Sequence, residues 1–517
     1  MATELITLQT PAEAVAWLRA QGATSLTTDS RSVAPHFNAA FVAWPGAAVD
    51  GRQFARQALA SGAVAVLVEK AGFDEFDFSQ SNSYGYARIA AYPGLKKASG
   101  EIASLFYDQP SQQLDIAAFT GTNGKTSSSW WLAQALSSLP GNSQQRCAIV
   151  GTLGTGTIGA IEDNGLTTPD PVLLQARLKT FVDAGCQTVA LEASSIGIAE
   201  GRLNGTRIHT AIFTNFTQDH LDYHGSMDAY WQAKAALFAW PNLKAAVINI
   251  DDPQGLALVD RLTNDVACKN IDLWTVSIHK SARLQAVHIR TTTTGLTFGV
   301  MEGTELHSLQ TSLVGRYNVS NLLGVIATMR SLGIPLAACV LACQQITPVP
   351  GRLEVIATSV DVQHPPTPLV VVDYAHTPDA LDKALMALRE IAALRGGKLW
   401  CIFGCGGNRD ASKRPIMGAT ARAHADFVVV TSDNPRGEAP GTIVAQILLG
   451  LEADARVQVQ LDRALAIADT IQQAATSDVI VIAGKGHEQY QEIAGIKHPF
   501  SDQAHAKAAL GVWGAAA

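Results

Sequence analysis

Residues 115–136 read DIAAFTGTNGKTSSSWWLAQAL, an apolar run that leads through a glycine-rich turn into a helical pattern. The backbone N–H groups of such a turn, at the start of a helix, favour an anionic phosphate. One position departs from the general phosphate-binding loop, because Phe119 stands where that motif carries a glycine. A plain strand-to-helix turn rarely supplies Gly-Lys-Thr in this setting, so we predict a nucleotide-binding loop.

Two residues of this loop have chemical roles that follow from the motif. Lys125 can reach the β- and γ-phosphates of a nucleotide, and Thr126 can ligate its Mg²⁺. Glu192 is expected near the carboxyl end of a later strand, TVALEASS, where parallel sheets hold their ligands. A carboxylate at that edge could hold the same Mg²⁺.

The 517 residues predict about three domains. Apolar strand-like runs alternate with helical runs, which indicates an α/β fold with parallel, doubly wound sheets. Turn-rich segments suggest boundaries near Ser111 and at PVPGRLEVI, which precedes the proline-rich stretch from Gln363 to Pro368. We therefore expect domains at residues 1–110, 111–348 and 349–517, and a polar loop from Phe78 to Tyr84 inside the first.

The composition excludes several classes of protein. A net charge of −7 argues against nucleic acid as a partner, because phosphate backbones require a dominant basic face. The apolar runs are far shorter than the roughly 20 residues that cross a bilayer, and the N-terminus lacks the pattern of a signal peptide. The seven cysteines have no paired spacing and predict free thiols in a reducing cytosol. Cys401 and Cys405 are interpreted as buried structural thiols rather than metal ligands.

Two further motifs are ambiguous by themselves. Gly154, Gly156 and Gly159 match a dinucleotide-binding pattern, but the residues that follow do not open a helix, so we expect no such site. His220 lies four residues from His224, a spacing that fits zinc ligands but is more often found in structural histidines.

The order of the motifs along the chain resembles the Mur ligase family of bacterial cell-wall synthesis. The segments that carry this resemblance are TGTNGKT, LEASSIGIAEGR, FTNFTQDHLDYHGSMDAYWQAK, GRYNVSN, PGRLEVI, VVDYAHTPDAL, FGCGGNRDASKRP, TSDNPRGEAP and AGKGHE. The N-terminal TTDSRSV and FVAWPGAAVDGRQF are similar to the uridine-nucleotide domain of that family. The resemblance implies a small N-terminal α/β UDP-binding domain, a central P-loop ATPase-like doubly wound domain and a C-terminal Rossmann-like α/β domain.

The activity that the resemblance implies is an ATP-driven amide ligation in the cytoplasm, a step of peptidoglycan precursor synthesis. A carboxylate of UDP-MurNAc-L-Ala-D-Glu attacks the γ-phosphate of ATP, and an amino acid's amine then displaces the acyl phosphate. A carboxylate acylates poorly until its oxygen becomes a phosphate leaving group, and the developing charge requires cations beside it. Small molecules are the expected partners, with no membrane insertion, and a monomer is expected.

The resemblance assigns roles to residues of this sequence around ATP and the metal. It places Lys125, His220 and Lys234 in catalysis, with Thr126 and Glu192 on a first Mg²⁺ and His220 on a second. Lys234 matches a lysine carbamylated by CO2, whose carbamate is an oxygen ligand for a hard cation, although alone it would read as a solvated helix lysine. The predicted ATP contacts are Gly121, Thr122, Asn123, Gly124, Lys125, Thr126, Ser127, Asn318, Asn321, Arg352 and His376.

The resemblance also assigns the other two substrates. The expected contacts of the UDP-MurNAc-dipeptide are Thr28, Ser30, Thr167, Thr168, Ser194, Glu200 and Arg202. Ile196 and Glu200 depart from the family, which usually carries His and Gln there. Asp433 to Arg436, DNPR, resemble the members that add meso-diaminopimelate, since an Arg fork suits a second carboxylate. The expected contacts are Arg409, Asp433, Asn434, Pro435, Arg436, Gly484 and Glu488.

Two other functions would share part of this sequence pattern. A folylpolyglutamate synthetase would share the phosphate loop and the carbamylated lysine, but should lack DNPR and the uridine-like domain. A P-loop switch that binds GTP would carry an N-K-x-D motif, and the sequence has none. Both are therefore less favoured than the ligase.

Overall fold

The computed structural model describes residues 5–34, 36–46, 49–76, 87–139, 146–293, 295–356, 367–451 and 456–513. Its contacts divide the chain into two compact units, Met1–Arg283 with Gly324–Pro335 and Leu284–Leu323 with Leu336–Ala517. The predicted loop from Phe78 to Tyr84 lies outside the described residues, as do residues 363–366 of the predicted linker.

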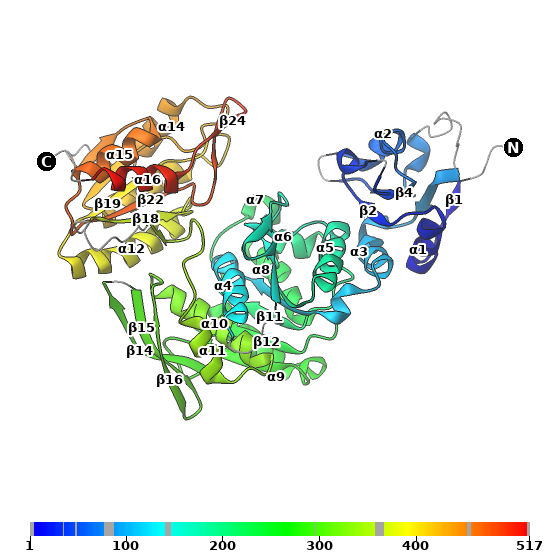
Figure 1. Cartoon of the computed structure of the whole chain (residues 1–517), viewed down its shortest axis with the longest axis horizontal. Helices are drawn as coiled ribbons and strands as arrows, with labels where there is room; N and C mark the ends of the chain where they lie inside the picture. Colours follow the sequence, from blue (N-terminus) through cyan, green and yellow to red (C-terminus); the bar gives the residue numbers. More distant parts are fainter. Residues whose placement is uncertain are drawn as a thin grey trace. The chain divides into compact units, whose positions relative to one another are not determined.

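The first unit begins with a small parallel sheet of order β1-β5-β4-β3-β2 (Figure 1). Its strands are short apolar runs, and helices cover both faces, α1 and α3 on one and α2 on the other. Its elements are β1 (Ile6–Thr7), α1 (Pro11–Ala20), β2 (Ser25–Thr27), η1 (Ser30–Ser32), β3 (Ala39–Ala43), η2 (Gly51–Phe54), α2 (Ala55–Ala60), β4 (Ala65–Glu69), η3 (Phe73–Glu75), β5 (Ile89–Tyr92), α3 (Leu95–Phe106) and η5 (Pro110–Gln113).

The larger sheet of the first unit has parallel strands in the order β13-β12-β11-β6-β10-β7, extended by antiparallel β8 and β9. Its strands are β6 (Asp115–Thr120), β7 (Arg146–Gly151), β8 (Gly154–Thr157), β9 (Ala160–Glu162), β10 (Cys186–Glu192), β11 (Thr210–Phe213), β12 (Ala245–Asn249) and β13 (Asp272–Ser277). Its helices are α4 (Lys125–Ser137), α5 (Pro171–Asp183), α6 (Ser195–Ala199), α7 (Leu221–His224), α8 (Met227–Ala235) and α9 (Pro253–Asn264), with η6 (Ala236–Ala239) and η7 (Val266–Cys268).

Strand β6 determines where this sheet can hold a ligand. It is the first of the parallel strands in the chain, yet it lies in the middle, with later strands on both sides. Chain connections diverge at such a strand, and ligands bind beside its carboxyl end. Residues at the ends of β6, β10, β11 and β12 therefore share one edge.

An antiparallel meander opens the second unit, with β14 (Leu284–Thr292), β15 (Gly295–Glu302) and β16 (Glu305–Thr311). The sequence pattern predicts a parallel sheet as far as residue 348, and this antiparallel meander is a correction to that prediction. Alternating buried and exposed residues along β15 and β16, with a turn at Gly303, account for these strands. Helix α10 (Tyr317–Ser331) follows, with its residues from Gly324 onward assigned to the first unit, and α11 (Leu336–Cys343) returns to the second.

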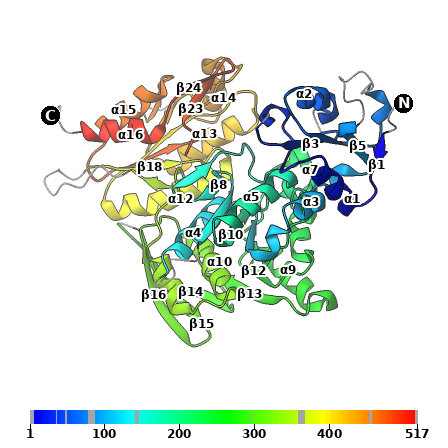
Figure 2. The ribbon, with the colours of Figure 1, turned by 45° about the vertical axis from the view of Figure 1, so that its right-hand side comes forward.

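The C-terminal sheet has the order β17-β18-β22-β19-β20-β21, parallel except for β17. Its elements are β17 (Glu354–Val355), β18 (Leu369–Asp373), α12 (Pro378–Arg395), β19 (Leu399–Phe403), α13 (Lys413–His424), β20 (Phe427–Val430), α14 (Pro440–Leu448), β21 (Val457–Val459), α15 (Arg463–Gln473), β22 (Val479–Ala483), the hairpin β23 (Tyr490–Ile493) and β24 (Ile496–Pro499), and α16 (Asp502–Gly511). Helices α12, α13 and α14 pack on one face, and α15 and α16 on the other (Figure 2).

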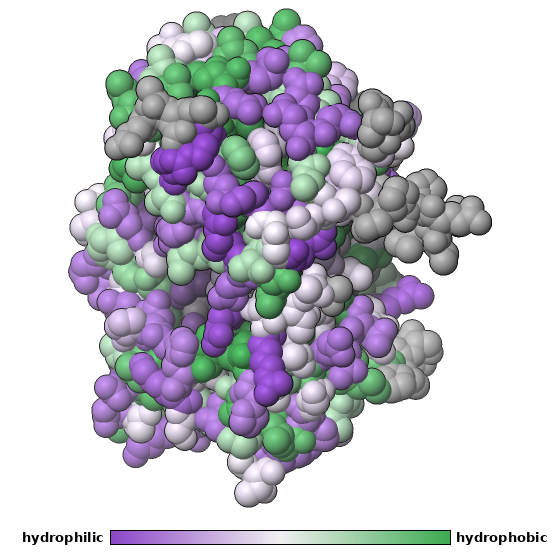
Figure 3. All heavy atoms as spheres, turned by 90° about the vertical axis from the view of Figure 1, so that its left-hand side faces the viewer, coloured by the Kyte–Doolittle hydropathy of each residue, from purple (hydrophilic) through white to green (hydrophobic). Residues whose placement is uncertain are grey.

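The predicted alternation of strands and helices is present, with β6 formed by the apolar run before the glycine-rich turn and β10 ending at Glu192 within TVALEASS. The Gly154 motif forms part of the hairpin of β7 and β8 and opens no helix. All seven cysteines are free, and Cys401 and Cys405 are buried. Over the face in Figure 3, hydrophilic and apolar residues are interspersed. Within the described ranges, no helix is long and apolar enough to cross a bilayer.

Candidate functional site

The predicted nucleotide loop joins β6 to α4 and depends on two glycines. Gly121 and Gly124 have φ values of +149° and +86°, in a region that side chains rarely adopt. A Cβ atom at Gly121 would also overlap the Oγ1 atom of Thr214. Gly124 is the residue before α4, so the loop ends on a helix N-terminus, where backbone N–H groups favour an anion.

The segment that follows β11 holds this loop in place. The Oγ1 atom of Thr214 donates to the carbonyl of Asn123 at 2.6 Å, and the side chain of Asn215 both accepts from the N–H of Asn123 and donates to its carbonyl, at 2.9 and 3.0 Å. The N–H of Thr122 donates to the carbonyl of Asn215 at 2.9 Å. The sequence pattern assigns no role to Thr214 and Asn215, although both directly follow a strand next to the loop.

Two lysines meet at the carbonyl oxygen of Gly121. Lys125 Nζ and Lys234 Nζ each donate to it at 2.8 Å. Lys234 is buried, and its Nζ lies 4.4 Å from the centre of the Tyr230 ring. Burial, and then the charge of Lys125, lower the pKa of Lys234 well below its usual value. Lys234 is therefore not a solvated helix lysine.

A buried carboxylate lies beside the loop at the end of β10. Glu192 Oε2 accepts from Thr126 Oγ1 at 2.8 Å and from Thr152 Oγ1 at 3.1 Å, and Oε1 accepts from the N–H of Thr152 at 2.8 Å. The neighbouring strand leaves room for this carboxylate only because residue 151 is glycine. A Cβ atom at that position would overlap the Glu192 side chain. The structure thus brings together Thr126 and Glu192, the two predicted ligands of the first Mg²⁺.

Four of the predicted UDP-substrate residues are linked to Glu192 by hydrogen bonds, directly or through a neighbouring residue. Thr168 Oγ1 donates to the carbonyl of Glu192 at 2.7 Å and lies 2.9 Å from Ser194 Oγ. Arg202 donates to the carbonyl of Thr168 at 3.0 Å. Thr167 bonds Thr152 at 3.0 Å. The residues predicted to contact the muramoyl-peptide are therefore contiguous with those predicted to hold the metal.

The other three lie where the small N-terminal sheet meets the larger one. Thr28 lies close to Asp170, which caps α5, and Ser30 is buried at the start of η1. Glu200 accepts from Lys96 of α3 at 2.5 Å and from Tyr223 of α7 at 2.6 Å. The Lys96 ammonium and the Tyr223 hydroxyl lower the pKa of Glu200. This glutamate therefore has the donor partners that its charge requires.

His220 directly precedes α7 and has a positive φ of 50°. Its Nε2 atom lies 3.5 Å from an oxygen of Asp219, while His224 contacts Ser195 Oγ at 3.0 Å. Among the described residues, no hydrogen bond or ion pair joins His220 to Glu192, and no three His, Cys, Asp or Glu side chains form a metal-binding group. The predicted contact of His220 with a second Mg²⁺ therefore stays a prediction.

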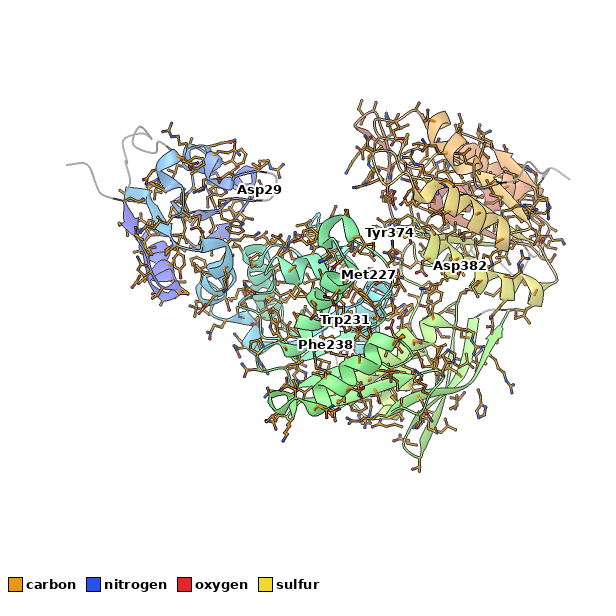
Figure 4. The ribbon with its side chains drawn as sticks, turned by 180° about the vertical axis from the view of Figure 1, so that it is seen from behind. Asp29, Met227, Trp231, Phe238, Tyr374 and Asp382 are labelled. Atoms are coloured by element: carbon orange, nitrogen blue, oxygen red, sulfur yellow. The ribbon has the colours of Figure 1, made fainter. Side chains whose placement is uncertain are left out.

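Helix α8, which carries Lys234, also carries the aromatic residues Tyr230 and Trp231. Trp231 packs edge-on against Phe213 and Phe216, with ring centres 5.4 Å apart in each pair. Figure 4 labels Trp231 on this helix and Phe238 on the turn that follows. Tyr230 bonds Thr122 Oγ1 at 3.2 Å, so α8 also contacts the phosphate loop.

The remaining predicted ATP contacts belong to the second unit. Asn318 and Asn321 are buried on α10 and are joined by a 3.0 Å hydrogen bond. Arg352 lies over the ring of Tyr374 at 4.5 Å, and the ring of His376 is 4.6 Å from that of Tyr374 (Figure 4 labels Tyr374). Asn318 and Asn321 therefore contact each other directly, whereas Arg352 and His376 each contact the ring of Tyr374.

The predicted amino-acid site gathers at the carboxyl ends of β20 and β22. Asn434 Nδ2 donates to Glu488 Oε2 at 2.8 Å, and Arg436 donates to the carbonyl of Gly407 at 2.9 Å. Gly484 approaches Asp433 so closely that a Cβ would overlap its carboxylate. Arg409 is exposed nearby, and Pro435 is buried in the same turn.

A fully buried ion pair supports both of these strand ends. Arg463 donates to Asp502 at 2.7 and 2.8 Å, and neither side chain is exposed. It also donates to the carbonyls of Ser432 and Ala483, the residues before Asp433 and Gly484. The sequence analysis missed Arg463, which lies on a helix without a motif.

Models of three Mur ligase domains match successive parts of the chain. The family's catalytic domain matches residues 23–107, the middle domain residues 119–329, and the glutamate ligase domain residues 351–486. The chain belongs to the Mur ligase family. The family predicted from the motifs, with its three-domain α/β architecture, is therefore confirmed, while the boundaries at residues 110 and 348 and the roles of single residues stay predictions.

Individual Mur ligases align over almost the entire chain. A relative from Acidovorax sp. (strain JS42), named UDP-N-acetylmuramoyl-L-alanyl-D-glutamate--2,6-diaminopimelate ligase, is 55% identical over 98% of each chain. A protein of the same name from Janthinobacterium sp. (strain Marseille) is 45% identical, also over 98% of each. A solved structure of a ligase with that name has 36% identity, a TM-score of 0.66 and 95% coverage of both chains.

Proposed function

We propose that this Mur ligase joins meso-2,6-diaminopimelate to UDP-N-acetylmuramoyl-L-alanyl-D-glutamate with hydrolysis of ATP to ADP and phosphate. The names of relatives up to 55% identical support this assignment. The observation that carries the ATP-dependent chemistry is the phosphate loop, with Lys125 folded over it and the Thr126–Glu192 pair beside it. The proposed place of action is the cytoplasm, and the proposed form is a monomer.

The donor set beside the loop fits Mg²⁺. A threonine hydroxyl and a buried carboxylate are hard oxygen ligands, which this cation prefers. Thr126 and Glu192 would hold one ion, and His220 would contact a second. When bound, Mg²⁺ neutralises charge on the transferring phosphoryl group.

The surroundings of Lys234 fit its modification by CO2. A carbamate forms on a neutral amine, and burial beside Lys125 lowers the pKa of Lys234, which favours that form. The product is an anion, so it would turn the repulsion between the two lysines into attraction. Its oxygens would then serve as a further hard ligand for the metal.

The residues of the chain would support two chemical steps. In the first, a carboxylate oxygen of the dipeptide attacks the γ-phosphorus, the bond to the β,γ-bridging oxygen breaks, and ADP leaves. Lys125 stabilises the negative charge on the phosphoryl oxygens. In the second, the amine attacks the acyl carbon, the carbon–oxygen bond to phosphate breaks, and the amine loses a proton. Arg202, Thr168 and Ser194 would hold the peptide's carboxylate and amide groups.

The amino-acid substrate would be bound at the ends of β20 and β22. Arg436 and Arg409 would bind carboxylates of diaminopimelate, and Asp433 and Glu488 an ammonium group. Lysine lacks the second carboxylate, so an arginine placed for it would discriminate against lysine. The contacts of ATP with Asn318, Asn321, Arg352 and His376 are part of the same proposal.

The two other functions predict different substrate requirements. A ligase of this kind should turn over ATP repeatedly only when the UDP-dipeptide and an amine are both present, with the amide product detected by mass. A folylpolyglutamate synthetase would require a folate and glutamate, and a nucleotide switch would turn over ATP with neither substrate. ADP release that ignores the UDP-dipeptide would contradict the proposal.

A further inference from the structure

Lys485 is a buried cation at the predicted amino-acid site that none of the assigned roles uses. It lies in the turn after β22, between Gly484 and Glu488, and its side chain is 0% exposed. Its Nζ atom donates to Asn434 Oδ1 at 2.9 Å and to Glu488 Oε2 at 2.8 Å. An ammonium so deeply buried requires such partners, since desolvation otherwise disfavours the charged form.

Asn434 closes a ring of three hydrogen bonds. Its Nδ2 atom donates to Glu488 Oε2 at 2.8 Å, while Oδ1 also accepts the backbone N–H of Glu492 at 2.9 Å. A lysine ammonium has donors only, so it can face only the oxygen end of an amide. Lys485 therefore helps to determine which way the Asn434 amide points, and so directs its N–H group at Glu488.

The ring leaves the two oxygens of Glu488 in different states. Oε2 accepts from both Lys485 and Asn434, whereas Oε1 accepts no hydrogen bond within the part of the chain that the structure describes. The Glu488 side chain is 17% exposed, so the carboxylate is both fixed and partly accessible. A group that is already fixed loses less entropy when it binds a ligand.

We propose that Lys485 is a positioning residue for the amino-acid substrate. Through Asn434 and Glu488 Oε2 it fixes the carboxylate of Glu488, and Oε1 remains to accept the substrate's ammonium group. This inference rests on the proposed function, because it takes diaminopimelate as the ligand of this site. In addition, the strength with which Glu488 binds the substrate's ammonium group would depend on Lys485, a cation that does not itself touch the substrate.

A purely structural ion pair would behave differently from a positioning pair. Loss of a structural pair lowers stability, but the folded variant keeps KM values close to those of the wild-type enzyme. Loss of a positioning residue raises the KM for diaminopimelate specifically, and the effect disappears when Glu488 can no longer bind the ammonium. A double-mutant cycle measures this dependence.

The experiment compares Lys485→Met, Glu488→Gln and the double variant by steady-state kinetics, with thermal melting as a check of folding. Lys485→Met should raise the KM for diaminopimelate about tenfold or more and leave that for ATP within about twofold. In the Glu488→Gln background, the same substitution should change the KM by less than about twofold. Lys497→Met is the matched control, because Lys497 contacts the nearby Tyr490 ring at 4.1 Å and should leave all KM values unchanged.

Three outcomes separate the possibilities. An unchanged KM for diaminopimelate in folded Lys485→Met would overturn the inference. If that variant does not fold, the double variant, which buries no unpaired charge, decides: a KM well above that of Glu488→Gln alone would contradict it. If the wild-type enzyme does not use diaminopimelate at all, the proposed function itself fails.

Discussion

The Nζ atoms of Lys125 and Lys234 share one acceptor, the carbonyl oxygen of Gly121, at 2.8 Å each. Burial of Lys234, and then the positive charge of Lys125, lower the pKa of Lys234. The phosphate loop, which positions Lys125, thereby contributes to the lowered pKa of a lysine on α8. A lowered pKa favours the neutral amine, which is the form to which CO2 adds.

Replacing Lys234 by Met should flatten the dependence of stability on pH. The pKa of Lys234 lies well below its usual value of 10.5 in the folded chain, so the unfolded chain binds the additional proton. Between the folded pKa and 10.5, the free energy of unfolding should therefore increase as the pH increases. This contribution to stability is lost as the pH falls through the folded pKa. Urea unfolding in CO2-free buffer between about pH 7 and 9.5 measures the slope. Equal slopes for Lys234→Met and the wild type would rule out the buried neutral amine.

Lys125→Ala should lose acyl-phosphate formation. The γ-phosphoryl oxygens would lose their nearest fixed cation, and such a loss costs on the order of a thousandfold in rate. Release of ADP in the presence of the UDP-dipeptide measures this step. Near-normal ADP release from the folded variant would remove Lys125 from the proposed mechanism.

Glu192→Gln should raise the concentration of Mg²⁺ that gives half of the maximal rate by about tenfold or more. The amide retains the size of the carboxylate and can still accept from Thr126, so the loss is mainly of charge. A titration of activity with MgCl2 at saturating ATP tests this expectation. A Mg²⁺ requirement equal to that of the wild type would show that Glu192 is a structural carboxylate.

Arg463→Ala should destabilise the C-terminal sheet strongly. It leaves Asp502 buried without its partner, a change that typically costs about 3–5 kcal/mol in the free energy of unfolding. Lys383→Ala, which breaks the half-exposed pair with Asp379 on α12, is the control and should have a several-fold smaller effect. Denaturant unfolding of both variants compares them. Similar losses would mean that the buried pair contributes no more than a surface pair.

The sequence predicted those parts of the site that a motif and a sheet rule determine. Thr126 and Glu192 were expected to meet because the motif sets a strand, turn and helix, and parallel strands end at one edge. The burial of Lys234 beside Lys125 was not derivable, because the pattern of α8 does not say which side chain faces the loop.

Contacts between residues far apart in the chain could not be predicted from the sequence either. The partners of Glu200, Lys96 and Tyr223, are 104 and 23 residues away in the chain. Lys485 escaped notice because its role depends on Asn434, which is 51 residues distant. The meander of β14 to β16 was missed because helical and parallel-strand patterns surround it.

The identity of the added amino acid is tested most directly by competition. Equal concentrations of meso-diaminopimelate and L-lysine are incubated with the enzyme, ATP, Mg²⁺ and UDP-N-acetylmuramoyl-L-alanyl-D-glutamate, and the products are separated by mass. The account predicts that the diaminopimelate product predominates by about tenfold or more, since only that substrate offers a second carboxylate to Arg436. A predominant lysine product, or no amide product with either amine, would contradict it.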